Sequence, residues 1–174
     1  MRLSNERRHE PPMTELPTGL HSKKTPAPEK APRGMVRLSS LQSLCQLYDI
    51  AIHYAFGSRG REALEWLQGK REALSPELSD LDLGGKPRPG VTFPVQRTVE
   101  LALALEDLFG ISRVDLVFLP QADPFLAVNI IRGERLYAAD PHTADEYDLY
   151  ILRRAGDCAF LERERLALIL ESAP

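Results

Sequence analysis

The chain has 174 residues, of which 43% are hydrophobic, so it is long enough to build one domain with a buried core. Its net charge of −3 lacks the general basic excess of a dedicated nucleic-acid binder, and no apolar run approaches the roughly 20 residues of a membrane span. The first residues lack the apolar stretch of a signal peptide, so we expect a cytoplasmic protein.

Residues 1–37 differ in composition from the rest of the chain. They hold eight Lys and Arg against four Asp and Glu, a net charge of +4, and six of the fourteen prolines. This segment shows no hydrophobic periodicity, and such a composition predicts a disordered tail. The alternatives are a basic arm that touches nucleic acid or a partner, and an upstream start codon assigned in error. A single domain is then expected over residues 38–174, with a net charge of −7.

The next segment predicts a helix, a strand and a phosphate-binding turn. Ser39 opens a capping-box pattern that starts a short amphipathic helix, and the apolar run 49–56 is typical of a central strand. Gly57 and Ser58 follow this strand and precede residues 61–74, which are rich in helix formers. A strand-to-helix turn offers free backbone N–H groups and the positive end of the helix dipole. This turn is therefore a candidate phosphate site.

Two aspartates stand two positions apart in the strand expected over residues 79–85. Alternate side chains of a strand point to the same face, so Asp80 and Asp82 should lie side by side, about 6.6 Å apart along the strand. Two carboxylates this close repel each other, and a divalent cation removes that penalty. Carboxylate oxygens are ligands that suit Mg²⁺.

A third carboxylate lies inside the next predicted strand. A helix expected over 94–110 leads to the apolar, β-branched segment 113–119, which contains Asp115. A carboxylate in such a segment is costly unless it is paired or bound to metal. If this strand lies beside the one that carries Asp80 and Asp82, the three acids can hold two metal ions for a displacement at phosphorus.

The remaining segments complete a mixed α/β fold. The pattern predicts a second apolar helix at 123–133, a short strand at 135–139 and a helical C-terminus from Thr143 to about Leu170, divided near Gly156. This order predicts an α/β (α+β) architecture, with a small mixed sheet of about four strands flanked by helices.

Each of these features also has a purely structural explanation. A Gly-Ser pair can be an ordinary turn, an Asp-x-Asp pair a solvated strand edge or a turn, and Asp115 a strand-edge residue or a salt-bridge partner. His53 and Trp66 are expected to be core residues rather than nucleotide contacts, and Cys45 and Cys158 to be buried free thiols. The three signals together, in this order and on these elements, favour a metal-dependent nucleotidyl-transfer site.

The ordered pattern of Gly-Ser, Asp-x-Asp and a later Asp resembles that of the minimal nucleotidyltransferases, the small prokaryotic branch of the polymerase-β-like superfamily. The stretch that begins "VDLVFL" strengthens the likeness, because an apolar helix leads to a Gly-x-x-Leu-Tyr strand and an acidic turn. The resemblance covers about residues 39–170. One departure is the 21-residue segment 59–79 between Ser58 and Asp80, which is longer than is typical of that branch. An extended helix and loop are expected to absorb it.

The resemblance implies transfer of a nucleoside monophosphate, usually AMP from ATP, to a hydroxyl group, an activity of the EC 2.7.7 type. Gly57 and Ser58 would hold the triphosphate, and Asp80 and Asp82 would bind Mg²⁺. Asp115 would complete a site for two ions and help to deprotonate the acceptor. Many members of this family are antitoxins of a HEPN-type toxin, which they neutralise by adenylylating a tyrosine, by direct binding, or by both.

Two alternatives remain at this stage. The chain could be a non-catalytic antitoxin that blocks its partner by contact, a reading that the long 59–79 segment motivates. It could also be a nucleotidyltransferase for a small molecule of the aminoglycoside type, although that activity usually needs a further acceptor-binding domain. The sequence leaves open the acceptor, the nucleotide and the oligomeric state.

Overall fold

The computed structural model describes residues 32–75 and 79–171 of the chain. Most of the predicted tail, residues 1–31, lies outside the described residues. The elements follow in the order α1 (Arg33–Leu47), β1 (Ile50–Phe56), η1 (Gly57–Arg59), α2 (Gly60–Leu67), β2 (Leu81–Pro87), α3 (Val95–Phe109), β3 (Val114–Phe118), η2 (Leu119–Gln121), α4 (Pro124–Ile131), β4 (Glu134–Ala138) and α5 (Pro141–Glu171).

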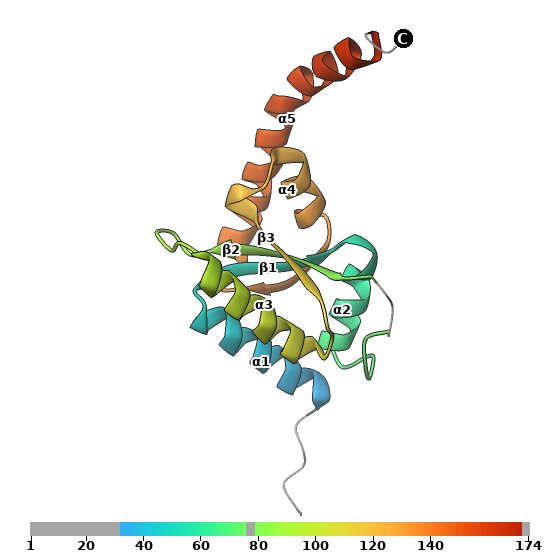
Figure 1. Cartoon of the computed structure of the whole chain (residues 1–174). Helices are drawn as coiled ribbons and strands as arrows, with labels where there is room; N and C mark the ends of the chain where they lie inside the picture. Colours follow the sequence, from blue (N-terminus) through green and yellow to red (C-terminus); the bar gives the residue numbers. More distant parts are fainter. Residues whose placement is uncertain (1–31, 76–78, 172–174) are drawn as a thin grey trace, which may run out of the picture. The chain divides into compact units, whose positions relative to one another are not determined.

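Within the described residues, four strands form one mixed sheet in the order β3-β2-β1-β4 (Figure 1). β1 runs antiparallel to both of its neighbours, β2 and β4, whereas β2 and β3 are parallel. A parallel pair needs a crossover connection, and α3 supplies it here. The predicted mixed sheet of about four strands is therefore confirmed.

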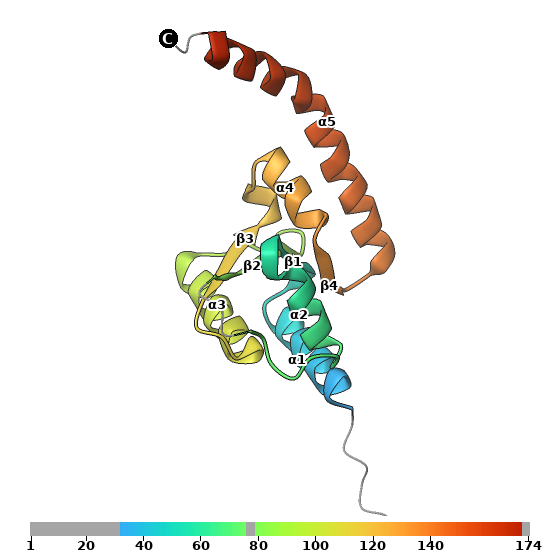
Figure 2. The same ribbon diagram turned by 90° about the vertical axis from the view of Figure 1, so that its right-hand side faces the viewer.

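Helices cover both faces of this sheet, as Figures 1 and 2 show. α1, α2 and α3 pack on one face around a core that includes Leu41, Leu83 and Leu105. α4 and the first half of α5 cover the other face around Tyr54 and Ile130. β1 supplies residues to both cores and is therefore apolar on both sides, whereas β2 supplies Leu81 and Leu83 to the first core alone.

α1 begins at Arg33, before the predicted domain start at residue 38 and before the helix start predicted at Ser39. Ser39 instead lies inside the helix. Tertiary contacts hold the early turns in place, because Gly34 packs closely against the main chain of Gly69. Arg37 donates hydrogen bonds of 2.7 Å to three main-chain carbonyls, those of Trp66, Arg71 and Glu72. All of these partners lie far along the chain, so the local pattern does not reveal them.

α2 ends at Leu67, so the long helix expected over residues 61–74 is not formed. Gly69 has φ +75°, a left-handed conformation that terminates a helix. The N–H of Lys70 donates to the Glu65 carbonyl (2.9 Å) and closes the final turn. A loop therefore absorbs most of the long segment before Asp80, and the predicted helical extension is wrong.

The caps of α3 and α5 differ in how well the sequence predicts them. Pro94 precedes α3, and Gly110 ends it in a left-handed conformation with φ +67°, as predicted. α5 starts after Asp140, whose carboxylate accepts from the N–H groups of His142 (3.3 Å) and Thr143 (3.1 Å). The cap is thus Asp140 rather than Thr143. α5 also runs unbroken through Gly156, so the predicted division there is wrong.

The two cysteines are free, as predicted. Cys45 is a buried residue of α1, and this burial raises the pKa of its thiol to about 12. Cys158 is half-buried on α5. None of the helices in the described part of the chain has the length and apolar character needed to cross a membrane.

Candidate active site

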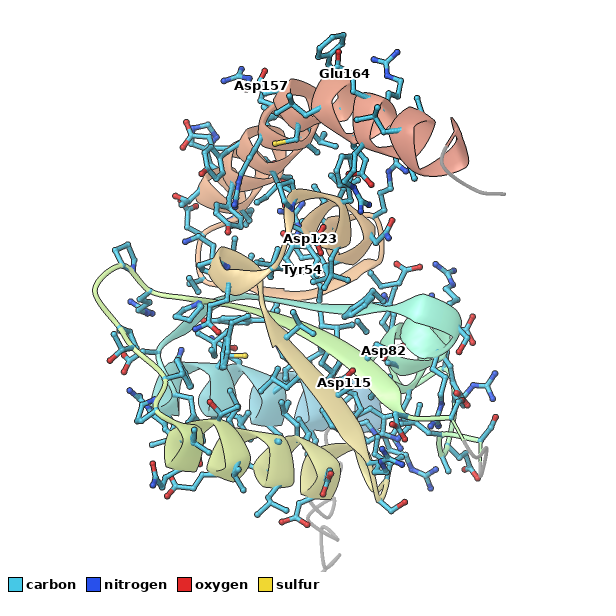
Figure 3. The ribbon with its side chains drawn as sticks, turned by 45° about the horizontal axis from the view of Figure 1, so that its top comes forward. Tyr54, Asp82, Asp115, Asp123, Asp157 and Glu164 are labelled. Atoms are coloured by element: carbon cyan, nitrogen blue, oxygen red, sulfur yellow. The ribbon has the colours of Figure 1, made fainter. Side chains whose placement is uncertain are left out.

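Asp82 and Asp115 lie opposite each other on the parallel strands β2 and β3. The strand register pairs these two residues directly. Paired residues of neighbouring strands point to the same face, with about 4.8 Å between the strands. Gly84, two residues after Asp82, faces Ile130 of α4, which identifies this face as the one that α4 covers. Figure 3 shows both carboxylates at adjacent positions on the two strands.

The electrostatics of this pair favour a bound cation. Burial raises the pKa of Asp82 above its ordinary value, and the negative charges of Asp115 and Asp80 raise it further. A divalent cation relieves this repulsion, and carboxylate oxygens are the donors that Mg²⁺ prefers. The two side chains therefore fit such an ion, and the exposed Asp115 leaves the site open to solvent.

Asp80 lies just before β2 and forms an ion pair with Arg113 (3.2 Å). Arg113 precedes β3 as Asp80 precedes β2, so the two residues meet at the same end of the parallel pair. Within residues 32–75 and 79–171, no three His, Cys, Asp or Glu side chains stand close enough to hold one metal ion. The structure thus brings Asp82 and Asp115 together and pairs Asp80 with an arginine.

The Gly57-Ser58 turn lies against the same carboxylate. β1 ends at Phe56, which pairs with Asp82, and Gly57 follows with φ +68°. A Cβ atom at Gly57 would collide with the Asp82 carboxylate and would be strained by the left-handed backbone, so this position favours glycine. Ser58 is exposed, and the chain then enters α2. The predicted phosphate turn and the predicted acids therefore adjoin each other.

Arg59 is a residue whose role the sequence did not reveal. Its side chain is only 4% exposed and donates to the main-chain carbonyls of Ser79 (2.8 Å) and Ser75 (3.0 Å), and to the Glu62 carboxylate (3.1 Å). Burial alone would raise the pKa of Glu62, but hydrogen bonds from Ser75 and Arg59 lower it overall. Arg59 therefore fixes the end of the loop next to Asp80. Its position directly after the Gly-Ser pair was the available signal.

The aromatic and histidine residues near the turn belong to the core, as expected. Trp66 packs against Phe109, with 5.0 Å between ring centroids, and against the guanidinium of Arg37. His53 is 1% exposed in the central strand. Neither residue takes part in the arrangement of acids and turn.

The fold is similar to that of several solved structures. A crystal structure of a mutant of the MntA–HpeT toxin-antitoxin matches with a TM-score of 0.55 and 20% identity, over 77% of this chain and 96% of that one. A structure of the tri-AMPylated Shewanella oneidensis HEPN toxin in complex with MNT antitoxin matches with a TM-score of 0.53 and 21% identity, over 79% and 97%. A toxin-antitoxin structure with AMP-PNP matches with a TM-score of 0.52 and 21% identity, over 77% and 96%.

No model of a known protein family matches the chain, and no curated protein matches it. The likeness to solved structures is therefore a likeness of fold, and it spans nearly the whole length of the chains matched. It agrees with the mixed sheet described above. The chain has the fold of the minimal nucleotidyltransferases, as its sequence pattern predicted.

Proposed function

We propose that this protein is a Mg²⁺-dependent nucleotidyltransferase that moves AMP from ATP to a hydroxyl group of a protein partner. The pairing of Asp82 with Asp115, with the main chain of Gly57 pressed against Asp82, is the observation that supports it most strongly. Asp82 and Asp115 would hold the cation, and Asp80 would contribute once its ion pair with Arg113 opens. Gly57 and Ser58 would hold the triphosphate through main-chain N–H groups and the serine hydroxyl.

The reaction is a displacement at the α-phosphorus of the nucleotide. The acceptor oxygen bonds to phosphorus as the bond to pyrophosphate breaks, and the hydroxyl proton passes to Asp115, the most exposed of the three acids. Bound Mg²⁺ supplies positive charge against the phosphate oxygens. The protein itself positions the two reactants, and Arg59 contributes by fixing the loop that carries Asp80.

We propose that the acceptor is a HEPN-type toxin and that this protein is its antitoxin. The similar structures are toxin-antitoxin complexes, one of them with AMP-PNP and another with a tri-AMPylated toxin. These likenesses in fold support the partner class, and the site chemistry described above supports the reaction.

The experiment is to incubate the protein with α-labelled ATP, Mg²⁺ and the product of the adjacent gene. Transfer of label to the partner is expected with the wild-type protein and should be lost in Asp82→Asn and Asp115→Asn. Asp157 is an exposed acid on α5 and lies far along the chain from the site. Asp157→Asn is therefore the matched control and should retain transfer. Equal labelling by Asp115→Asn and the wild type would exclude the proposed chemistry.

A second candidate is an antitoxin that acts by binding alone, and one observation favours it. Arg113 occupies the Asp80 carboxylate and so competes with a metal ion for it. In that case Asp115→Asn would neutralise the toxin as well as the wild type does, and no label would reach the partner.

A further inference from the structure

Among residues 32–75 and 79–171, no strand pairs with the outer side of β3, which is therefore a free strand edge beside the proposed site. β3 ends the sheet, with β2 on its inner side. The carbonyl of Arg113 accepts from the N–H of Leu81 (3.2 Å), so inward and outward groups alternate from that bond along β3. The main-chain groups that point outward are those of Val114, Leu116 and Phe118.

The first and the last outward groups of this edge have hydrogen-bond partners, whereas the groups between them have none within the part of the chain that the structure describes. The N–H of Val114 donates to the Glu106 carboxylate (3.2 Å), and the carbonyl of Phe118 accepts from Ala122 (3.2 Å). Between these bonds, the N–H and carbonyl of Leu116 project from the edge. A strand edge of this kind is a template for pairing with an extended peptide.

An apolar groove of about 610 Å³ runs along the same edge. It lies between the start of α3, β3 and the start of α4, and its lining includes Phe93, Val95, Val99, Leu116, Val117 and Leu126. On α3, Val95, Val99 and Leu103 are 76%, 50% and 55% exposed. These three residues are spaced four apart and so form one stripe along the helix. Exposed apolar surface gathered in this way marks an interaction site.

We propose that the acceptor protein presents its reactive hydroxyl on an extended segment that binds as an added strand along the free edge of β3. This inference rests on the proposed nucleotidyl transfer. The continuity of the edge with Asp115 selects this occupant, because Asp115 belongs to β3 itself and directly precedes Leu116, which lines the groove. A small hydroxyl compound would use neither the Leu116 main chain nor the stripe on α3.

Side-chain alternation sets the chemistry of the added segment. A residue that pairs with Asp115 points to the same face, with Cβ atoms about 5 Å apart. Its hydroxyl oxygen forms the bond to the α-phosphorus, the bond to pyrophosphate breaks, and the proton passes to Asp115. The residues before and after it point to the other face, where Leu116 and the α3 stripe lie. The preferred acceptor is therefore a hydroxyl residue flanked by apolar residues.

The binding test uses the full chain and a short synthetic peptide with a central tyrosine between valines. At about 1 mM peptide, the concentration that half-saturates a weak complex, hydrogen exchange of the Leu116 amide should slow about twofold. A matched peptide with aspartates in place of the valines should leave that exchange rate unchanged. An unchanged Leu116 amide with the valine peptide overturns the proposal.

The activity test uses two variants of the edge and one control. Leu116→Pro removes an outward N–H without removing a bond to β2, and Val99→Lys places a charge on the stripe if the proline variant does not fold. Both should lower label transfer to the valine peptide by about tenfold, equivalent to 1.4 kcal/mol, with ATP binding kept. Val36→Lys, at a site with matching exposure on α1, should transfer label normally.

The outcomes separate this inference from the proposed function. Wild-type transfer rates in both edge variants would overturn the inference and leave the function intact. A protected Leu116 amide without transfer of label by any form of the protein would overturn the function and support the docking edge.

Discussion

The stability of this protein should fall in mild acid because of His53. This side chain is 1% exposed in the central strand, and within the described part of the chain neither ring nitrogen has a hydrogen-bond partner in good geometry. Burial lowers the pKa of His53 from 6.5 to about 4, and a polar contact with the main chain of Gly84 opposes this only in part. The unfolded chain therefore takes up this proton at a higher pH than the folded protein.

The magnitude follows from that difference in pKa. The unfolding free energy keeps its full value above pH 6.5 and falls as the pH decreases from 6.5 towards 4. Each pH unit in this window costs about 1.4 kcal/mol of unfolding free energy. The whole window, from pH 6.5 to about 4, therefore costs about 3 kcal/mol. A loss of this size is a large part of the 5–15 kcal/mol that stabilises a typical domain.

The measurement is urea unfolding of the wild type and His53→Leu at pH 7 and near pH 4.5. At pH 7 the variant should equal or exceed the wild type, because leucine leaves no buried nitrogen unpaired. Near pH 4.5 the unfolding free energy of the variant should exceed that of the wild type by about 2–3 kcal/mol more than at pH 7. The pKa shifts of other groups affect both proteins equally and cancel in this difference. His142→Leu, at an exposed histidine, is the control and should follow the wild type. Parallel profiles for His53→Leu and the wild type would refute the reasoning.

Three further predictions concern the site. Gly57→Ala should abolish nucleotidyl transfer and lower the unfolding free energy by about 1–2 kcal/mol, because it strains a left-handed residue against a carboxylate. An activity assay tests the first effect, and urea unfolding tests the second. Arg113→Gln should raise Mg²⁺ affinity a few-fold, measured by calorimetry, because it frees Asp80, and unchanged affinity would contradict this. Arg59→Ala should lower the unfolding free energy by about 3 kcal/mol, because it removes a buried guanidinium that donates to two part-buried carbonyls and to the Glu62 carboxylate. The exposed Arg61→Ala should change stability much less, and equal losses would count against this role.

The fold was predictable because its signals are local. Pro94 and Gly110 bound α3, and apolar runs mark the strands, so the element order and the mixed sheet followed from the sequence. The facing of Asp82 and Asp115 was predictable in outline, since each acid interrupts an apolar strand. The strand register itself was not readable from either segment.

The features that the sequence missed depend on contacts between distant segments. The early start of α1 depends on Arg37 and on carbonyls about 30 residues away. The helix-forming residues after Leu67 do not form a helix because Gly69 turns the chain back against α1. The partner of Asp80 is an arginine that precedes another strand, so this ion pair can be predicted only when the alignment of β2 with β3 is known. In each case tertiary packing overrides local propensity.

The crossover through α3 also sets the order in which the two facing acids can meet. Asp82 cannot reach its counterpart through a hairpin, because parallel neighbours join only after the intervening helix has crossed the sheet. During synthesis, a ribosome-bound chain that stops before Val114 would carry one acid of the pair without the other. The proposed nucleotide chemistry therefore has to wait until β3 has emerged and docked, however early the glycine turn is made.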